Sequence, residues 1–344
     1  MNISSKNLKE IRLVIVFVLI SIVLGSALSL LNAGHVSLKS IVTGGIMGFC
    51  ISSICAVGNY AFIYRLRHLP FTTHLLLSTA YYTFVASAVM AAKFIIFDHT
   101  HDMAKWTPNL VSATLLTLGI SFIAAFVLML RRMLGPNVLL NFFTGRYHTP
   151  VEEERIFMFL DIVSSTMIAE KIGHLKFHVF LNDYFYDITD AILSAEGEIY
   201  KYVGDEIIVS WRLSDSIINI RCIQSFFEIQ KSIEEKKQIY LNKFGFFPYC
   251  RAGLHCGPVI VGEMGDFKQE IAFLGDTVNT TARIQEACKT YGADLLVSSA
   301  LLGKLQLPGD YKVTSLGEIQ LKGKDKPMEL FGIAKTRVKP NFNT

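Results

Sequence analysis

Two aspartates lie where apolar segments of the sequence end or turn. Asp161 follows the continuous apolar run 156–160, and Asp205 lies between the strand-like runs 198–203 and 206–211. A Gly-Asp dipeptide between two such runs predicts a β-hairpin with Asp205 at its tip. If this hairpin lies beside the first run in one sheet, the two carboxylates converge and suit hard divalent cations such as Mg²⁺. Asp161 alone would serve equally well as a cap for the following helix.

A lysine, an amide and a guanidinium have spacings that suit a nucleotide. Lys201 lies on the first strand of the predicted hairpin, and strict alternation puts it on the same face as Asp205. Asp276 is the expected N-cap of a later helix, which places Asn279 and Arg283 on one helix face. An amide beside a guanidinium suits a sugar hydroxyl and a phosphate, although most helical arginines are simply solvated.

Five motifs follow one another in a fixed order along the second half of the chain. They are Phe159-x-Asp161-Ile162-x-x-x-Thr166, Lys201-Tyr202-Val203-Gly204-Asp205, Arg251-Ala252-Gly253-Leu254-His255-x-Gly257, Gly275-Asp276-Thr277-Val278-Asn279-x-x-x-Arg283 and Leu321-Lys322-Gly323-Lys324. This set resembles the catalytic domain of class III nucleotidyl cyclases and covers about residues 155–335. The resemblance implies an α+β, ferredoxin-like domain. A four-helix membrane anchor ahead of such a domain also resembles bacterial members.

The resemblance implies a role for each matching residue. Asp161 and Asp205, with the Ile162 carbonyl, would bind two divalent cations, Mg²⁺ or Mn²⁺. Asn279 would orient the ribose, and Arg283 would stabilise the pentacoordinate phosphorus. The remaining candidates for substrate contact are Lys201 at the adenine, Arg251 and Lys322 at the triphosphate, and Thr166. In this family the metal carboxylates come from one chain, and the lysine, asparagine and catalytic arginine from the other, which implies a homodimer with shared sites.

One position departs from the family pattern. Where members usually have Asp, Thr or Ser to accept from the adenine amino group, this chain has Ala272. Adenine selectivity would then rest on Lys201 and backbone groups. The expected activity is that of an adenylate cyclase, a phosphorus–oxygen lyase that converts ATP to cyclic AMP and pyrophosphate. A guanylyl or dual-specificity cyclase, and a receptor whose cyclase-like domain only binds nucleotide, remain alternatives.

The first part of the chain has the sequence of a membrane anchor. Four apolar runs, 11–31, 40–57, 75–97 and 110–130, are each about as long as a helix that spans a bilayer. Basic residues flank them on one side, which predicts that both termini and the catalytic domain are cytoplasmic, at the inner (cytoplasmic) membrane. These residues are Lys6, Lys9, Arg12, Arg65, Arg67, Arg131 and Arg132. Gly44 and Gly48 form a GxxxG pattern that would let two helices approach closely.

The composition agrees with this division. Of 344 residues, 51% are hydrophobic and only 18% are charged, which argues against a single soluble globule. Residues 1–150 hold 11 basic and 3 acidic side chains, and the remainder holds 22 and 26. The positive excess therefore flanks membrane segments, and no nucleic-acid partner is expected. The six scattered cysteines are expected to be reduced thiols.

The chain is thus expected to have three parts. Residues 1–130 form the four-helix transmembrane anchor, 131–154 a coupling segment, and 155–335 the catalytic domain. Within the coupling segment, Leu134-Gly135-Pro136 should end the fourth helix, because proline cannot continue it. A short amphipathic helix is then expected within residues 137–147.

Overall fold

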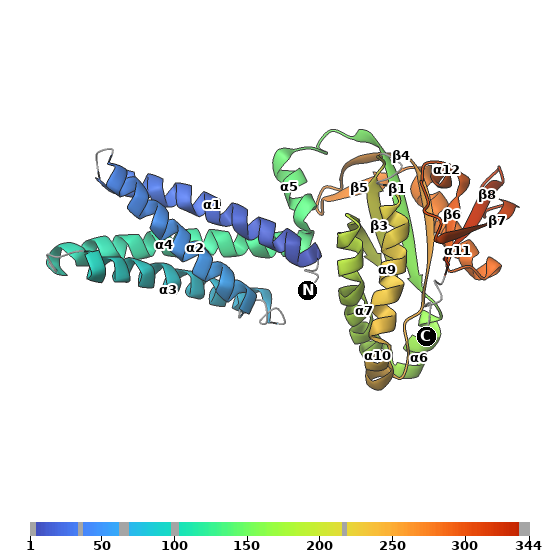
Figure 1. Ribbon diagram of the computed structural model, residues 1–344, viewed down its shortest axis with the longest axis horizontal. Helices are drawn as coiled ribbons and strands as arrows, with labels where there is room; N and C mark the ends of the chain where they lie inside the picture. The colour runs from blue at the N-terminus through green and yellow to red at the C-terminus, as the bar shows by residue number, and fades with distance from the viewer. Residues whose placement is uncertain (1–4, 34–36, 62–68, 98–102, 215–218, 337–344) are drawn as a thin grey trace, which may run out of the picture. The chain divides into compact units, whose positions relative to one another are not determined.

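The computed structural model describes residues 5–33, 37–61, 69–97, 103–214 and 219–336 (Figure 1). The chain divides into two compact units, one formed by Asn7–Thr144 and the other containing Gly145–Thr344. The first unit consists of the helices α1 (Ser5–Ala33), α2 (Leu38–Ala61), α3 (Phe71–Phe97), α4 (Met103–Leu134) and α5 (Pro136–Thr144).

Three helices of the first unit contain segments long and apolar enough to cross a membrane. These segments are Leu38–Asn59 in α2, Phe71–Lys93 in α3 and Thr114–Leu134 in α4. The apolar segment of α1, Val14–Leu30, is shorter. Three of the four expected spans therefore have the required length, and a crossing by α1 stays a prediction. Arg65 and Arg67, which contribute to the predicted orientation, lie outside the described residues.

The GxxxG pattern of α2 lies directly against α1. A Cβ atom built on Gly44 would lie 2.2 Å from the carbonyl oxygen of Gly25, and one on Gly48 would lie 2.1 Å from that of Ser21. No larger side chain fits at either glycine without moving a helix backbone. The expected close approach of two helices is confirmed, and it occurs within one chain.

The break after the fourth helix has the local chemistry that the sequence predicted. Gly135 has φ +91°, and its N–H donates to the carbonyl of Arg131 at 3.0 Å, which ends α4. Pro136 is the first residue of α5, where its fixed φ favours a helix and its missing N–H costs nothing.

The second unit is a mixed α/β domain built on one sheet (Figure 1). Its strands are β1 (Val151–Ile162), β2 (Glu198–Val203), β3 (Glu206–Arg212), β4 (Cys250–Met264), β5 (Glu270–Leu274), β6 (Leu295–Ser298), β7 (Tyr311–Ile319) and β8 (Met328–Lys335). Its helices are α6 (Ser165–Ile172), α7 (His174–Ser194), α9 (Arg221–Glu235), α10 (Lys237–Phe244), α11 (Asp276–Tyr291) and α12 (Ser299–Leu302).

The first four strands have the ferredoxin-like order. In the sheet order β2-β3-β1-β4-β6-β8-β7, the first three neighbouring pairs are antiparallel. Helices α6 and α7 connect β1 to β2, and α9 and α10 connect β3 to β4. This is two βαβ crossovers in one antiparallel sheet, so the predicted α+β, ferredoxin-like class is confirmed.

Strand β1 is buried on both faces. Ile156, Met158, Leu160 and Ile162 join the cluster that includes α7 and α9, whereas Phe157 and Phe159 join a second cluster on the opposite face. This explains why its sequence is continuously apolar instead of alternating.

Helix α11 covers the face of the sheet opposite α7 and α9. A Cβ atom on Gly253 of β4 would lie 2.3 Å from the main-chain nitrogen of Gln285, and one on Gly257 would lie 2.7 Å from Oγ1 of Thr277. The glycines of the third motif therefore let a helix pack directly onto the strand backbone.

Strand β1 starts earlier than the sequence indicated. The coupling segment was expected to extend to residue 154, but Glu152, Glu153 and Glu154 already belong to β1 and pair with Ile260, Val259 and Pro258 of β4. Because these residues are charged, the sequence did not indicate that they belong to the strand. Pairing with β4 extends β1 beyond its apolar part.

Candidate active site

The sheet register brings Asp161 and Asp205 together. β3 lies beside β1 with Leu160 opposite Ile207, so the β2–β3 turn that contains Asp205 lies next to the end of β1. Gly204 takes φ +64° in this turn, a conformation that glycine adopts without strain. The Asp161 and Asp205 carboxyl groups are within hydrogen-bonding reach of each other. The predicted convergence of the two carboxylates is therefore present in the structure.

The surroundings of Asp161 disfavour its charged form. Burial raises the pKa of Asp161 to about 7, reinforced by the hydrogen bond with Asp205 and by the charges of Asp205 and Glu206. Burial also raises the pKa of Glu206 to about 7, with further contributions from the charges of Asp205 and Glu286. Glu206 thus adds a third acidic group beside the pair, one that the sequence analysis did not single out because it lies inside a strand-like run.

The chemistry of this donor set fits a divalent cation. Among the described residues, no hydrogen bond or ion pair of Asp161 or Asp205 with a lysine or arginine is found, so a cation would relieve the repulsion between them. In the same part of the chain, no cluster of three or more metal-capable side chains is formed. Further ligands must then be oxygens of the main chain, water or substrate. The Ile162 side chain is buried in the core, so only its main chain is free to contribute.

Arg251 is positioned beside the carboxylate pair. It lies on β4 directly opposite Asp161 in the strand register. Its Nε atom is buried and has no hydrogen-bond partner within the described residues. A buried guanidinium nitrogen without a partner is a feature that a bound phosphate would satisfy.

Asp161 does not cap the helix that follows it, because the N-cap position is Ser164. α6 begins at Ser165, but Ser164 has φ 60° and its side chain makes no capping hydrogen bond. The Thr166 side chain is exposed in the first turn. The structure therefore leaves Thr166 accessible but gives it no partner that would define a role.

The Lys201 side chain reaches β5. Its ammonium group forms an ion pair with Glu270, with Nζ 2.8 Å from Oε1. The β2–β3 register shifts between Ile199 and Lys201, so strict alternation does not hold along β2. The shift lies before Lys201, and pairing from Lys201 to Val203 is regular, so the expectation that Lys201 shares a face with Asp205 stays a prediction.

Helix α11 carries the predicted amide and guanidinium. The helix starts at Asp276 with Gly275 as its N-cap, so Asp276 is the first helical residue and not the cap. Asn279 and Arg283 still lie four residues apart, and Asn279 is exposed. Arg283 forms an ion pair with Glu286 at 2.5 Å.

The fifth motif reaches the start of α11. Lys324 donates to the Asp276 carboxylate, and Asp276 also accepts from Thr280 at 3.3 Å. The hydrogen bond from Lys324 is the main reason that the pKa of Asp276 is lowered. Lys322, the residue predicted to contact the triphosphate, is exposed two positions away.

The candidate residues lie on several elements of one chain. Asp161, Asp205 and Arg251 lie around the end of β1, Lys201 lies beside β5, and Asn279 and Arg283 lie on α11. Within the described ranges, no hydrogen bond or ion pair joins the carboxylate pair to Lys201, Asn279 or Arg283.

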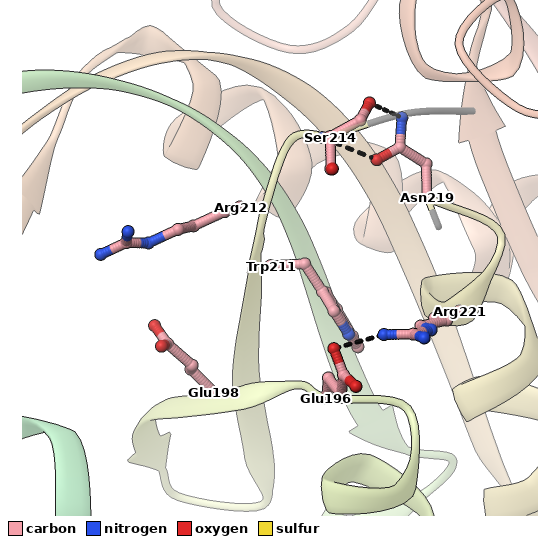
Figure 2. Close-up of a pocket in the computed structure, with 7 residues that line it drawn as sticks. All are labelled: Glu196, Glu198, Trp211, Arg212, Ser214, Asn219 and Arg221. Carbon is pink, nitrogen blue, oxygen red and sulfur yellow. Dashed lines mark hydrogen bonds and ion pairs between the residues drawn. The ribbon is translucent and has the colours of Figure 1, made fainter. Parts of the chain in front are cut away.

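A pocket of about 310 Å³ lies elsewhere in this unit. Figure 2 shows that Arg221 forms an ion pair with Glu196 in it and that Asn219 exchanges hydrogen bonds with Ser214. None of the residues predicted from the sequence lines this pocket. Because these polar groups satisfy one another, we assign the pocket no role in catalysis.

Comparison with known proteins identifies relatives of the second unit. The chain is 36% identical over 208 residues to "Adenylate cyclase 2" of Rhizobium meliloti, which covers 60% of this chain and 57% of that protein. It is 27% identical over 224 residues to a receptor-type guanylate cyclase of Caenorhabditis elegans, which covers 60% of this chain and 18% of that protein. The chain therefore spans less than two thirds of the length of both relatives.

A solved structure shares the fold. A bacterial light-regulated adenylyl cyclase superposes with a TM-score of 0.55 at 22% identity, covering 63% of this chain and 64% of that one. The adenylate and guanylate cyclase catalytic domain matches residues 149–334, more than half of the sequence, and this chain therefore belongs to that family.

Proposed function

We propose that this chain is a membrane-bound adenylyl cyclase that converts ATP to cyclic AMP and pyrophosphate. The observation that carries the proposal is the Asp161–Asp205 carboxylate pair beside Arg251, whose buried Nε has no partner among the described residues. Two acids, with an arginine opposite one of them in the strand register, suit a metal-bound triphosphate. The 36% identity with an adenylate cyclase supports adenine over guanine as the base.

The reaction makes one bond and breaks one. The ribose 3′-oxygen attacks the α-phosphorus, the bond to the β-phosphate oxygen breaks, pyrophosphate leaves, and the 3′-hydroxyl proton passes to solvent. Two divalent cations, Mg²⁺ or Mn²⁺, held by Asp161, Asp205 and the Ile162 carbonyl, would make the hydroxyl more acidic and neutralise charge on the leaving oxygens.

The remaining roles belong to side chains that position the substrate. Arg251 and Lys322 would bind the triphosphate, and Thr166 is exposed where it can contact the substrate. Asn279 would orient the ribose, and Arg283 would exchange its bond with Glu286 for one with the phosphoryl oxygens in the transition state. Positioning and electrostatic stabilisation account for catalysis in such a site, and no protein nucleophile is needed.

The active unit is proposed to be a homodimer with shared sites. Asp161 and Asp205 would act with Lys201, Asn279 and Arg283 of a second copy of the chain. The arrangement follows the family pattern, in which the metal carboxylates come from one chain and the lysine, asparagine and arginine from the other. A closed two-fold dimer would create two equivalent sites.

The first unit is proposed to hold the enzyme in the inner (cytoplasmic) membrane. Three helices of sufficient length and apolarity support anchoring. We propose that α1 is a fourth span and that both termini and the catalytic domain are cytoplasmic, as the distribution of basic residues favours.

A dual-specificity cyclase is the second candidate. Ala272 is 6% exposed and has no polar side-chain atom with which to read a base. Its strand partner across the β4–β5 pair, Gly262, has none either. The C. elegans relative is a guanylate cyclase, which supports keeping GTP as a tested substrate.

A product assay tests the proposal. Membranes containing the full chain are incubated with ATP or GTP and Mg²⁺ or Mn²⁺, and cyclic nucleotides are separated by chromatography. We expect cyclic AMP to dominate, and Asp161→Asn and Asp205→Asn each to lower turnover at least 100-fold. Asp266→Asn, an exposed carboxylate in the β4–β5 turn, is the matched control and should leave turnover unchanged. Nucleotide binding without any cyclic product would indicate a receptor domain and contradict the proposal.

A further inference from the structure

The Lys201–Glu270 ion pair joins two strands at an accessible edge of the domain. Lys201 Nζ lies 2.8 Å from Glu270 Oε1, and the two side chains are 41% and 39% exposed. Both charged groups are therefore held in place by each other and still open to a ligand. In sequence they are far apart, so only the folded chain brings them together.

A β-bulge directs Lys201 toward β5. Ile199 is paired with Val209 and packs against the cluster that contains α7, whereas Lys201 is paired with Ile208, which faces the other side of the sheet. Tyr200, between them, contacts the Phe273 ring of β5 with centroids 4.8 Å apart. Because of the bulge, the side chains of the consecutive residues Tyr200 and Lys201 point to the same side of the sheet.

Glu270 is the polar residue on the strand that carries Ala272. The two lie two positions apart on β5, so they share one face of the strand, about 7 Å apart. Ala272 offers only a methyl group, and Gly262 opposite it offers no side chain. The side chain of Glu270 is longer than that of Ala272 and carries a carboxylate. This carboxylate is paired with the ammonium group of Lys201, the residue that the family resemblance assigns to the adenine.

The charge state of Glu270 suits a hydrogen-bond acceptor. The hydrogen bond from Lys201 lowers the pKa of Glu270, and the charges of Lys201 and Lys268 add to this effect. At neutral pH the pair therefore presents an ammonium donor beside a carboxylate acceptor.

The edges of the two purines differ in the order of their donors and acceptors. Adenine presents a donor at its 6-amino group and an acceptor at N1, whereas guanine presents an acceptor at O6 and a donor at N1. A carboxylate at the 6-position and an ammonium at N1 can each form a hydrogen bond with adenine. With guanine, the carboxylate would face the O6 acceptor and the ammonium would face the N1 donor, so neither bond forms. We propose that Glu270 accepts from the 6-amino group while Lys201 donates to N1, so that this ion pair selects ATP in place of a side chain at position 272. The proposal rests on the proposed cyclase function.

Substrate analogues test the contact directly. The full chain in membranes is assayed with ATP, GTP and purine ribonucleoside triphosphate, which lacks the 6-amino group. We expect wild type to prefer ATP over the purine analogue by about tenfold to 100-fold in kcat/KM, the effect of one charge-assisted hydrogen bond. In Glu270→Met, which has about the same length but no carboxylate, this preference and the preference over GTP should both shrink by about that factor. Glu270→Asp should keep part of the preference, and Asp266→Asn should keep all of it.

The outcomes separate this proposal from the proposed function. A wild-type chain that forms no cyclic nucleotide would overturn the proposed function. If the wild-type chain is a cyclase and Glu270→Met has the same nucleotide preferences, only the role of Glu270 is overturned. Equal loss of turnover with all three nucleotides would also overturn it, because a merely structural residue lowers every rate together.

Discussion

The Asp161 carboxyl group at the end of β1 lies within hydrogen-bonding reach of the Asp205 carboxyl group in the β2–β3 turn. Two carboxyl groups can share a hydrogen bond only while one of them holds a proton. In the folded, metal-free chain the charge of Asp205 therefore repels that of Asp161, and a bound metal ion would remove this repulsion. A site of this kind favours function at the expense of stability.

Asp161→Asn should stabilise the metal-free chain while it abolishes turnover. The pKa of Asp161 is raised to about 7 in the folded chain from an ordinary value of 3.8, so the folded state binds more protons between these values. Stability of the metal-free wild type should consequently fall as the pH rises from about 4 to about 7, with no further change from this group above that. The amide variant lacks this loss, and we expect a gain of about 1–2 kcal/mol at pH 8 that disappears near pH 4.

Thermal unfolding in a chelating buffer measures this difference. The chain has two tryptophans, so a Trp106→Phe background leaves Trp211, a core residue of the second unit, as the fluorescent probe. Asp266→Asn is the charge-matched control and should show no such pH-dependent gain. A lower unfolding temperature for Asp161→Asn at pH 8 would contradict the expected repulsion.

Mixing two inactive variants should restore activity. Asp161→Asn removes the proposed metal half of the site, and Arg283→Ala removes the proposed phosphoryl half. In a two-fold dimer with shared sites, a mixed pair contains one site with neither substitution. Co-expression should therefore recover about a quarter of the wild-type rate if subunits mix at random. Arg283→Ala co-expressed with Asn279→Ala is the control, since both changes fall on the same half and no recovery is expected.

Gly253 should not tolerate a side chain. A Cβ atom there would lie 2.3 Å from the main-chain nitrogen of Gln285 in α11, so the helix would have to move away from β4. We expect Gly253→Ala to destabilise the second unit by about 1–3 kcal/mol and to lower turnover, because α11 carries Asn279 and Arg283. Gly309→Ala is the control, since nothing lies within 4 Å of a Cβ at that position. Equal unfolding temperatures for the two variants would show that α11 does not depend on this close approach.

The parts of the site that sequence could predict are those set by local patterns. The run that ends at Asp161 is apolar on both faces of β1, and the Gly-Asp turn follows from its own residues. Once β2 and β3 form a hairpin beside β1, Asp205 in their turn must lie near the end of β1. For the same reason the break at Gly135 and Pro136 could be located from residue types alone.

The parts that sequence could not predict depend on pairing between distant strands. The bulge that turns Lys201 toward β5 exists only in the β2–β3 register, and Glu270 belongs to no recognised motif. Arg155 is a comparable case, since a charged residue at the start of a strand suggests an exposed position. It is 1% exposed because its partners come from three separate segments.

Arg155→Met should destabilise the second unit strongly. Arg155 donates to Glu153 at 2.8 Å and to Glu198 at 2.7 Å, and its guanidinium lies over the Phe273 ring at 5.0 Å. Burial acts to raise the pKa of Glu153, but the hydrogen bond and charge of Arg155 outweigh it, so the net shift is downward. Removal of the guanidinium leaves these acids without their main partner, at a cost of about 2–4 kcal/mol.

The pH dependence and a matched variant distinguish this effect from general loss of packing. Because the folded pKa of Glu153 lies below its ordinary value of 4.5, its contribution to stability is present above that pH and is lost as the pH falls through the folded pKa. The difference in unfolding free energy between wild type and Arg155→Met, followed by Trp211 fluorescence, should therefore become smaller as the pH falls below about 4.5. Arg146→Met, whose exposed guanidinium lies 3.6 Å from Glu153, should change stability by less than about 1 kcal/mol. A pH-independent loss in Arg155→Met would mean that its hydrocarbon contacts, and not the ion pairs, hold β1 to β2.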